Sequence, residues 1–474
     1  MSNSTTEQAG TQARYKQELR RDLGVTGNVV LCVAAITPAV VVFAVAPVIF
    51  KLTGTGAFWV LIIGGLLGAA MAFCWAELGS AFPIAGGDYT IVSRTLGRAL
   101  GFVSLMLTGP VQAFLIPAVV AVSIAGYLRS VFDVDARVLG AIVIAIGVVI
   151  TIVGVKFTAR AVGFLLAFEI SAITFITVLG FVTSQRGPNV LFAPVIFGDG
   201  SATASPLPWS VLFAGVAVAA FAYNGFQGAL LFSEETKGNP RAIAKSVFIS
   251  LAVAVVTAVI PVAAGLVGAT DLAAFTRADS PWEVIIHGFG NPVFSTIVNL
   301  GIALSIMNGV VALIPYFSRV LYSSGRDYAW PAFISKPLAT VHPKLETPWV
   351  ASLVVGGGAI VLILGFDVDA MATVVGAVVA VEFVLVASSA IVSRIRQPGI
   401  RRAYKMPLWP FIPAFGALFA AVILTQQATI DLLIVGAIIA ISLLYWALYL
   451  RPRKDTRLRM LEPIFGDKPE GTTN

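Results

Sequence analysis

The most constraining feature of this sequence is a series of long apolar stretches that recurs along nearly all of its 474 residues. A hydrocarbon core about 30 Å thick is crossed by a helix of about 20 apolar residues. Mean hydropathy is +0.92, and charged residues make up only 12% of the chain, about half the usual share in a soluble protein. The sequence therefore predicts an all-α integral membrane protein, in which each long apolar stretch is a transmembrane helix.

Charge clusters and Gly or Pro punctuation divide the chain into about twelve such spans. Their predicted bounds are 25–50, 57–81, 100–128, 138–155, 161–183, 209–233, 243–267, 292–322, 348–366, 370–392, 408–424 and 432–450.

The basic residues predict the orientation of these spans. If the N-terminus lies inside, the two tails and the inner connections hold 26 of the 31 Lys and Arg residues, and the positive-inside rule then places both termini in the cytoplasm of a cell-membrane protein. The net charge of +7 thus reflects the basic residues of the inner connections and tails. We expect these residues to contact anionic lipid rather than nucleic acid. The five outer exceptions are Lys51, Arg129, Arg137, Arg186 and Arg277.

Enzyme chemistry has little support in the sequence. The two histidines, His287 and His342, fall in predicted loops on opposite sides, and no Cys or His spacing suits a metal. Cys32 and Cys74 lie inside spans, where packing thiols are expected. We expect no catalytic residue, no metal and no cofactor, apart from a proton as a coupling ion.

Three acidic residues lie within apolar sequence, where an ionisable group indicates function by default. Glu77 ends an apolar run near the cytoplasmic mouth, and either a structural ion pair or a functional role fits it. Glu382 leaves the same two alternatives open. Glu169 lies deeper, in "GFLLAFEISAITF".

Two spans carry breaks at corresponding places. In the first, Thr37 precedes Pro38, the order of a hydroxyl N-cap followed by proline at a helix start. In the sixth, "FAYNGFQG" contains the turn dipeptide Asn224-Gly225. Unwound backbone at membrane depth is tolerated only where it lines a cavity, so the two breaks predict a substrate site near the midplane.

The separation of the breaks by five spans predicts two inverted repeats of five helices. The predicted organisation is a disordered cytoplasmic tail at 1–22, a first repeat at 23–184, a second repeat at 209–395, two appended helices at 406–450 and a basic cytoplasmic tail at 451–474.

Three motifs resemble those of a known family, the amino acid-polyamine-organocation permeases. They are "WAELGSAFPIAGGDYTIVSRTLG" from Trp75, "FAYNGFQGALLFSEETKGNPRAIAKSV" from Phe221 and "YSSGRDYAWPAFISKPLATVHPKLETPW" from Tyr322. The resemblance covers the chain from about Leu23 to Leu450. It implies a fold of two inverted repeats with broken helices 1 and 6, working by alternating access on a small-molecule substrate.

The resemblance also implies a substrate site between the two breaks, with Phe226 as a candidate gate and Gln112 and Asn308 as side walls. The implied substrate-binding residues are Ile36, Thr37, Pro38, Ala39, Val40, Phe221, Tyr223, Asn224, Gly225, Phe226, Gln112 and Asn308.

Two departures from the family pattern bear on the mechanism. Pro38 offers no N–H where many members bind a substrate carboxylate, so the amides of Ala39 and Val40 or the Thr37 hydroxyl would substitute. In the fifth span, Glu169 stands where sodium-independent members often carry a lysine. A partly desolvated glutamate can shuttle a proton, so we predict proton-coupled transport with Glu169 as the carrier.

Neither break carries a carboxylate, which favours a neutral amino acid over a cationic amine such as a polyamine or ethanolamine. A transport-dead nutrient sensor is a further alternative, although the tails are short for a signalling domain. An ion channel would need a polar ring that the spans do not show. Oligomeric state is left open.

Overall fold

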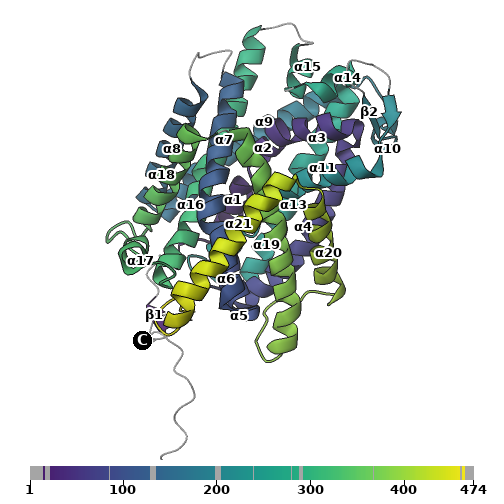
Figure 1. The fold of residues 1–474 in the computed structure, drawn as a ribbon. Helices are drawn as coiled ribbons and strands as arrows, with labels where there is room; N and C mark the ends of the chain where they lie inside the picture. The colour runs from purple at the N-terminus through teal and green to yellow at the C-terminus, as the bar shows by residue number, and fades with distance from the viewer. Residues whose placement is uncertain are drawn as a thin grey trace, which may run out of the picture.

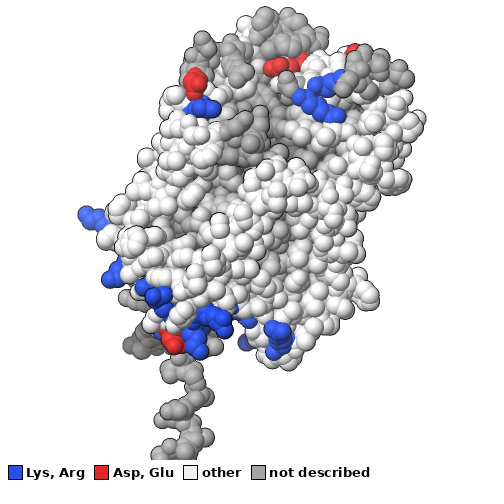
Figure 2. Space-filling view, viewed as in Figure 1, with Lys and Arg blue, Asp and Glu red and all other residues white. Residues whose placement is uncertain are grey.

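The computed structural model describes residues 14–16, 22–84, 86–128, 135–197, 204–238, 240–278, 280–287, 292–366, 368–459 and 462–464. This part of the chain is almost entirely helical, and its long helices run side by side in one bundle (Figure 1). The space-filling view shows a broad belt without charged side chains, with charges gathered at the two ends (Figure 2). The prediction of a helical, multi-pass membrane protein is thus confirmed, with short strands as a small addition.

Eight helical runs among the described residues are long and apolar enough to cross a membrane. One of them, Val25–Ala81, covers the first two predicted spans, and three shorter apolar helices lie in the predicted spans 6, 9 and 11. The total of twelve spans and the inverted repeat stay predictions.

The first part of the chain holds the elements that surround the first break. They are α1 (Val25–Ile36), α2 (Pro38–Val40), the π-turn η1 (Val41–Val45), α3 (Ala46–Thr53), η2 (Gly54–Gly56), α4 (Ala57–Ala81), α5 (Asp88–Thr95), α6 (Arg98–Met106), η3 (Leu107–Val111), α7 (Gln112–Leu128), α8 (Ala136–Val153), α9 (Val155–Val182) and α10 (Asn189–Phe192).

The second part begins with the helix that contains the second break. Its elements are α11 (Trp209–Ala222), α12 (Gly228–Leu231), α13 (Arg241–Gly268), α14 (Leu272–Arg277), α15 (Pro281–His287), α16 (Pro292–Arg326), α17 (Ala332–Leu338), α18 (Trp349–Gly365), α19 (Val368–Arg396), α20 (Phe411–Thr425), α21 (Thr429–Tyr445), η4 (Trp446–Leu450) and η5 (Arg451–Arg453).

Four short strands complete the described structure. β2 (Val195–Phe197) and β3 (Ala204–Pro206) pair antiparallel, whereas β1 (Arg14–Lys16) and β4 (Glu462–Ile464) pair in parallel. β1 belongs to the N-terminal tail for which disorder was predicted, and this short stretch forms a strand instead. The other residues of that tail, apart from Asp22, lie outside the described residues.

Both predicted breaks are present, and each has a local backbone cause. Thr37 adopts a left-handed conformation, with φ 56° and ψ 66°, between α1 and α2. The proline that follows cannot donate a helical hydrogen bond, so a new helix begins there. In the sixth predicted span, α11 ends at Ala222 and α12 begins at Gly228, with Gly225 at φ 130° between them.

The broken helices lie inside the bundle. Helix α1 contacts α9, α13 and α16, while α12 contacts α1, α13 and α16. Every described residue from Leu31 to Val42 is buried. The breaks are therefore enclosed by protein, as unwound backbone at membrane depth requires.

Candidate substrate site

The two breaks touch each other. A Cβ added to Gly225 would lie 3.0 Å from the backbone nitrogen of Ile36 and 3.1 Å from its Cα. Helix α16 also packs closely against the first break, because a Cβ on Gly309 would lie 2.1 Å from Cγ2 of Thr37. Glycine is needed at position 225 both for this close approach and for its positive φ.

Glu169 joins the first break to two neighbouring helices. This carboxylate lies on α9, is fully buried, and accepts a hydrogen bond of 2.7 Å from the backbone amide of Ala39. Its other oxygen accepts a hydrogen bond of 2.8 Å from Nδ2 of Asn308 on α16. The amide that was predicted to bind a substrate carboxylate therefore binds a carboxylate of the protein itself.

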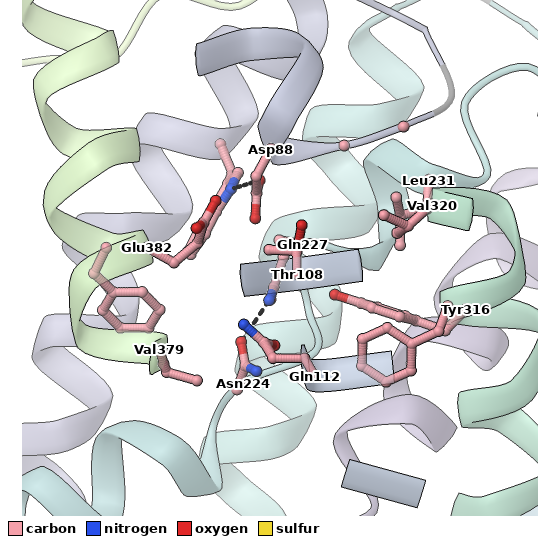
Figure 3. A pocket seen from close by; sticks show the side chains of 15 residues that line it. Asp88, Thr108, Gln112, Asn224, Gln227, Leu231, Tyr316, Val320, Val379 and Glu382 are labelled. Atoms are coloured by element: carbon pink, nitrogen blue, oxygen red, sulfur yellow. Dashed lines mark hydrogen bonds between the residues drawn. The ribbon is translucent and has the colours of Figure 1, made fainter. Parts of the chain in front are cut away.

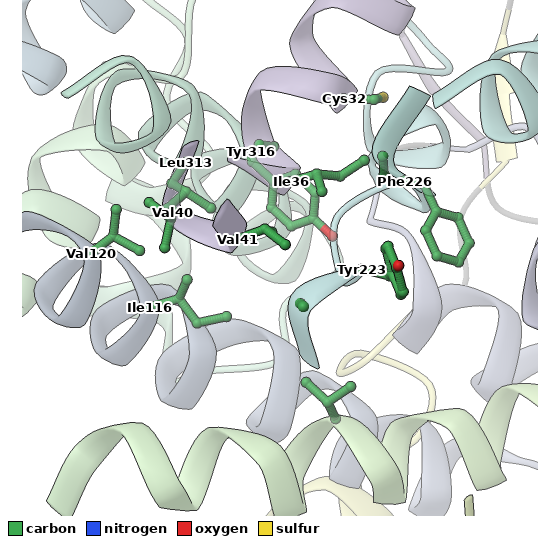
Figure 4. Close-up of a cluster of buried hydrophobic side chains, with 14 of the residues drawn as sticks. Cys32, Ile36, Val40, Val41, Ile116, Val120, Tyr223, Phe226, Leu313 and Tyr316 are labelled. Atoms are coloured by element: carbon green, nitrogen blue, oxygen red, sulfur yellow. The ribbon is translucent and has the colours of Figure 1, made fainter. Parts of the chain in front are cut away.

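A mostly apolar cavity of about 30 Å³ lies between the two breaks. It has room for about two water molecules, so this conformation is closed around the site. Figure 4 shows Val40, Ile116, Val120 and Leu313 close together. The lining residues are Ala35, Ile36, Thr37, Val40, Val41, Val45, Ile116, Val120, Ala222, Asn224, Gly225, Leu313, Tyr316 and Phe317.

A second, more polar cavity of about 10 Å³ adjoins the first, because Asn224, Tyr316 and Phe317 line both. Figure 3 shows Asp88 and Glu382 at one end of it and Asn224 and Gln112 at the other. The lining residues are Trp75, Gly86, Gly87, Asp88, Thr108, Gln112, Asn224, Gln227, Leu231, Tyr316, Phe317, Val320, Val379, Glu382 and Phe383.

Backbone and side-chain groups within the second break satisfy one another. The amide of Gly225 donates a hydrogen bond of 2.9 Å to Oε1 of Gln227, and Nε2 of Gln227 donates to Oδ1 of Asn224. The hydrogen bonds of these groups thus lie within the break itself and do not involve another helix.

The predicted site residues divide into those that line a cavity and those that do not. Ile36, Thr37, Val40, Asn224 and Gly225 line the apolar cavity, and Gln112 lines the polar one. Pro38 and Ala39 are buried beside the first break without lining either cavity, and Asn308 bonds Glu169 instead. The side chain of Phe221 lies outside the described residues.

Three details differ from the predictions. The Thr37 hydroxyl does not cap a helix; it donates a hydrogen bond of 2.6 Å to the carbonyl of Ile36, because the left-handed backbone turns it back. The hydroxyl of Tyr223 points away from the cavities and donates to the carbonyl of Leu61 at 3.0 Å. Phe226 packs edge-to-face on Trp75, with ring centroids 5.3 Å apart, and lines neither cavity.

Of the two alternatives for Glu77, the geometry favours the structural one. Its carboxylate lies 2.6 Å from Nη2 of Arg394 and 3.2 Å from Nε of Arg402, and it accepts the amide of Met406 at 2.7 Å. These contacts tie the end of α4 to the end of α19 and to the segment before α20.

Sequence reasoning missed several polar residues that the fold brings together. Asp88 follows two glycines at the start of a helix, and this position was the signal that could have found it. Tyr316 carried no signal beyond its place in a long apolar helix. Buried ion pairs between α16 and the segment after α12 were also missed: Arg319 with Glu235 at 2.9 Å and Arg326 with Glu234 at 2.9 Å.

A multi-pass helical bundle with two broken helices that meet at a buried cavity is the architecture expected of a membrane transporter. The sequence model of the amino acid permease family matches residues 24–448, so the chain belongs to this family, within the amino acid-polyamine-organocation superfamily, and is a transporter rather than an enzyme.

Several relatives are similar over most of their length. The branched-chain amino acid permease BcaP of Bacillus subtilis is 26% identical over 462 residues, covering 92% of this chain and 94% of the relative. The methylthioribose transporter of the same organism is 28% identical, covering 78% of this chain and 82% of the relative. The mouse Asc-type amino acid transporter 1 is 26% identical, covering 82% and 72%.

Proposed function

We propose that this protein carries an amino acid with an apolar side chain across the cell membrane by alternating access, driven by protons that bind to Glu169. The observation that carries the proposal is the pair of hydrogen bonds from the Ala39 amide and Asn308 to the Glu169 carboxylate. A buried carboxylate at membrane depth that touches the unwound backbone of the site can link its own protonation to the shape of that site.

The proposed substrate class follows from the apolar cavity. Ile36, Val40, Ile116, Val120 and Leu313 supply an aliphatic wall, which suits an aliphatic side chain. The name of the branched-chain permease among the relatives agrees with this choice. A cationic amine is the second candidate, because Asp88 and Glu382 line the adjoining polar cavity.

Alternating access is supported by the closed state of the site. Cavities of about 30 Å³ and 10 Å³ cannot hold an amino acid, so the surrounding helices must separate for the substrate to enter. The two inverted repeats predicted from the sequence would supply the two halves that move. The distribution of basic residues supports cytoplasmic termini.

The test is a thermal-shift screen of purified protein against amino acids and amines, followed by uptake of each hit into proteoliposomes with and without a pH gradient. We expect aliphatic amino acids to stabilise the protein and to accumulate when the outside is acidic. Stabilisation by amines alone would contradict the proposed substrate class, and accumulation independent of the pH gradient would contradict proton coupling.

A further inference from the structure

The polar cavity brings together two buried acids from distant parts of the chain. Asp88 begins α5, and its Oδ1 accepts a hydrogen bond of 2.5 Å from the indole Nε1 of Trp75. Glu382 lies on α19, and its Oε1 accepts a hydrogen bond of 2.5 Å from the Ser104 hydroxyl. Both acids line the same space, which holds about one water molecule (Figure 3).

One oxygen of Glu382 has no hydrogen bond within the part of the chain that the structure describes. Glu382 is only 3% exposed, and its Oε2 has no hydrogen-bond partner among the described residues. A buried polar atom without a partner is costly, so a further group is expected to meet it. A proton on this carboxyl, donated to a water in the cavity or to the neighbouring acid, satisfies the atom directly.

Two ionised carboxylates at this place would also repel each other without compensation. No lysine or arginine is among the described residues that line the cavity, and the other titratable residue there is Tyr316. Burial raises the pKa of Asp88, against which the Trp75 hydrogen bond acts. Charged groups on the surrounding elements have partners of their own: Glu77 with Arg394 and Arg402, Glu235 with Arg319, Asp327 with Tyr89, Arg326 and Arg94.

The chemistry of the lining favours a proton over a metal ion. The side-chain oxygens of Asn224 and Gln227 already accept hydrogen bonds from within the second break. The Thr108 hydroxyl donates a hydrogen bond of 2.9 Å to the carbonyl of Ser104. A sodium ion needs several free oxygens around it, whereas a proton needs only the two carboxyl groups.

We propose that Asp88 and Glu382 share one proton and form a second proton-binding site, separate from Glu169 and adjoining the substrate cavity. The pair behaves as two like charges that cannot both ionise, so its titration belongs to the pair rather than to either residue. The site lies between the second break and the start of α5. If the protein transports as proposed above, the proton is exchanged when the helices on that side separate.

The test is infrared spectroscopy of the purified protein in bilayers, because the carbonyl stretch of a protonated carboxylic acid reports the proton without any transport assay. Spectra are recorded between about pH 5 and 9 in H₂O and D₂O. In the wild type we expect such a band at neutral pH. In the Asp88→Asn/Glu382→Gln double variant we expect the band to lose the intensity of one protonated carboxyl group, because the pair shares one proton.

The single variants sharpen the test. In Asp88→Asn or Glu382→Gln the remaining acid loses its like-charge neighbour, so its band should titrate at lower pH than the pair does. Asp271→Asn is the matched control: Asp271 caps α14 in a loop through a 2.9 Å hydrogen bond from Ala274, and asparagine caps equally well. This control should leave the band unchanged.

Three results would overturn the proposal. The first is a wild type without any carboxylic acid band at neutral pH, which needs no variant to be folded. The second is a double variant that keeps the full band. The third is loss of the wild-type band on adding sodium, which would make the pair a metal-ion site. Failure of transport in the screen above, with the band behaving as expected, would count against the proposed function alone.

Discussion

The two breaks differ in where they find their hydrogen-bond partners. In the first, the Ala39 amide is bound by Glu169 on α9, which is also held by Asn308 on α16. In the second, Gly225, Gln227 and Asn224 satisfy one another within four residues of chain. The first break is thus coupled to its neighbours through an ionisable group, while the second keeps its own shape. We infer that the first break responds to proton binding and that the second presents a fixed surface to the substrate.

The largest effect is expected at the contact between the breaks. Gly225→Ala places a Cβ about 3 Å from the Ile36 backbone and forces a side chain into φ 130°. The backbone strain alone is of order 1–3 kcal/mol, and the contact of the new Cβ with Ile36 adds to it by pushing the two breaks apart. We expect a lower melting temperature and loss of uptake into proteoliposomes.

Gly126→Ala is the control for this substitution. Gly126 is exposed on α7, and a Cβ there would meet nothing within 4 Å. Alanine is favoured over glycine in a helix by about 1 kcal/mol. Wild-type uptake in Gly225→Ala would show that the breaks need no close contact.

A smaller effect is expected within the second break. Gln227→Ala removes the acceptor of the Gly225 amide and the donor to Asn224. An unsatisfied buried group costs about 1–3 kcal/mol, so we expect substrate binding to weaken by about fivefold or more while the pH dependence of uptake is kept. Gln426→Ala, in the turn after α20, is the exposed control. A change in pH dependence in Gln227→Ala would mean that the second break is coupled as well.

The smallest effect is expected at Thr37. A β-branched residue is disfavoured at φ 56°, whereas asparagine tolerates the left-handed region. The Thr37 hydroxyl bonds only the carbonyl of Ile36 among the described contacts. Thr37→Asn relieves about 1 kcal/mol of backbone strain but buries a larger amide in a mostly apolar wall, so the net change in stability should be no more than about 1 kcal/mol. Thermal unfolding measures this, and a clear loss of stability would show that the hydroxyl matters more than the backbone strain.

Local features of the fold were predictable from the sequence, and contacts between distant segments were not. The breaks at Thr37-Pro38 and Asn224-Gly225 follow from backbone preferences of single residues, so both were found. The family resemblance pointed to Glu169 and Asn308, although their mutual hydrogen bond depends on how α9 and α16 pack. The meeting of Asp88 with Glu382 joins residues almost three hundred positions apart, which no local pattern encodes.

The directions of side chains beside the second break could not be predicted from the sequence either. Tyr223 and Phe226 flank the second break in sequence, yet both turn toward α4, where the Leu61 carbonyl and the Trp75 ring receive them. A position beside a break does not decide which face of the unwound segment a side chain takes. Only the packing of α4 against that segment decides it.

The central claim is that Glu169 links proton binding to the shape of the first break. It is tested most directly by measuring substrate accumulation and substrate exchange in proteoliposomes containing wild type or Glu169→Gln. Glutamine keeps the size of the side chain and a carbonyl acceptor for the Ala39 amide, but it cannot bind and release a proton. We predict that Glu169→Gln still exchanges substrate without a pH gradient and no longer accumulates it with one. Accumulation at the wild-type level in this variant would contradict the account.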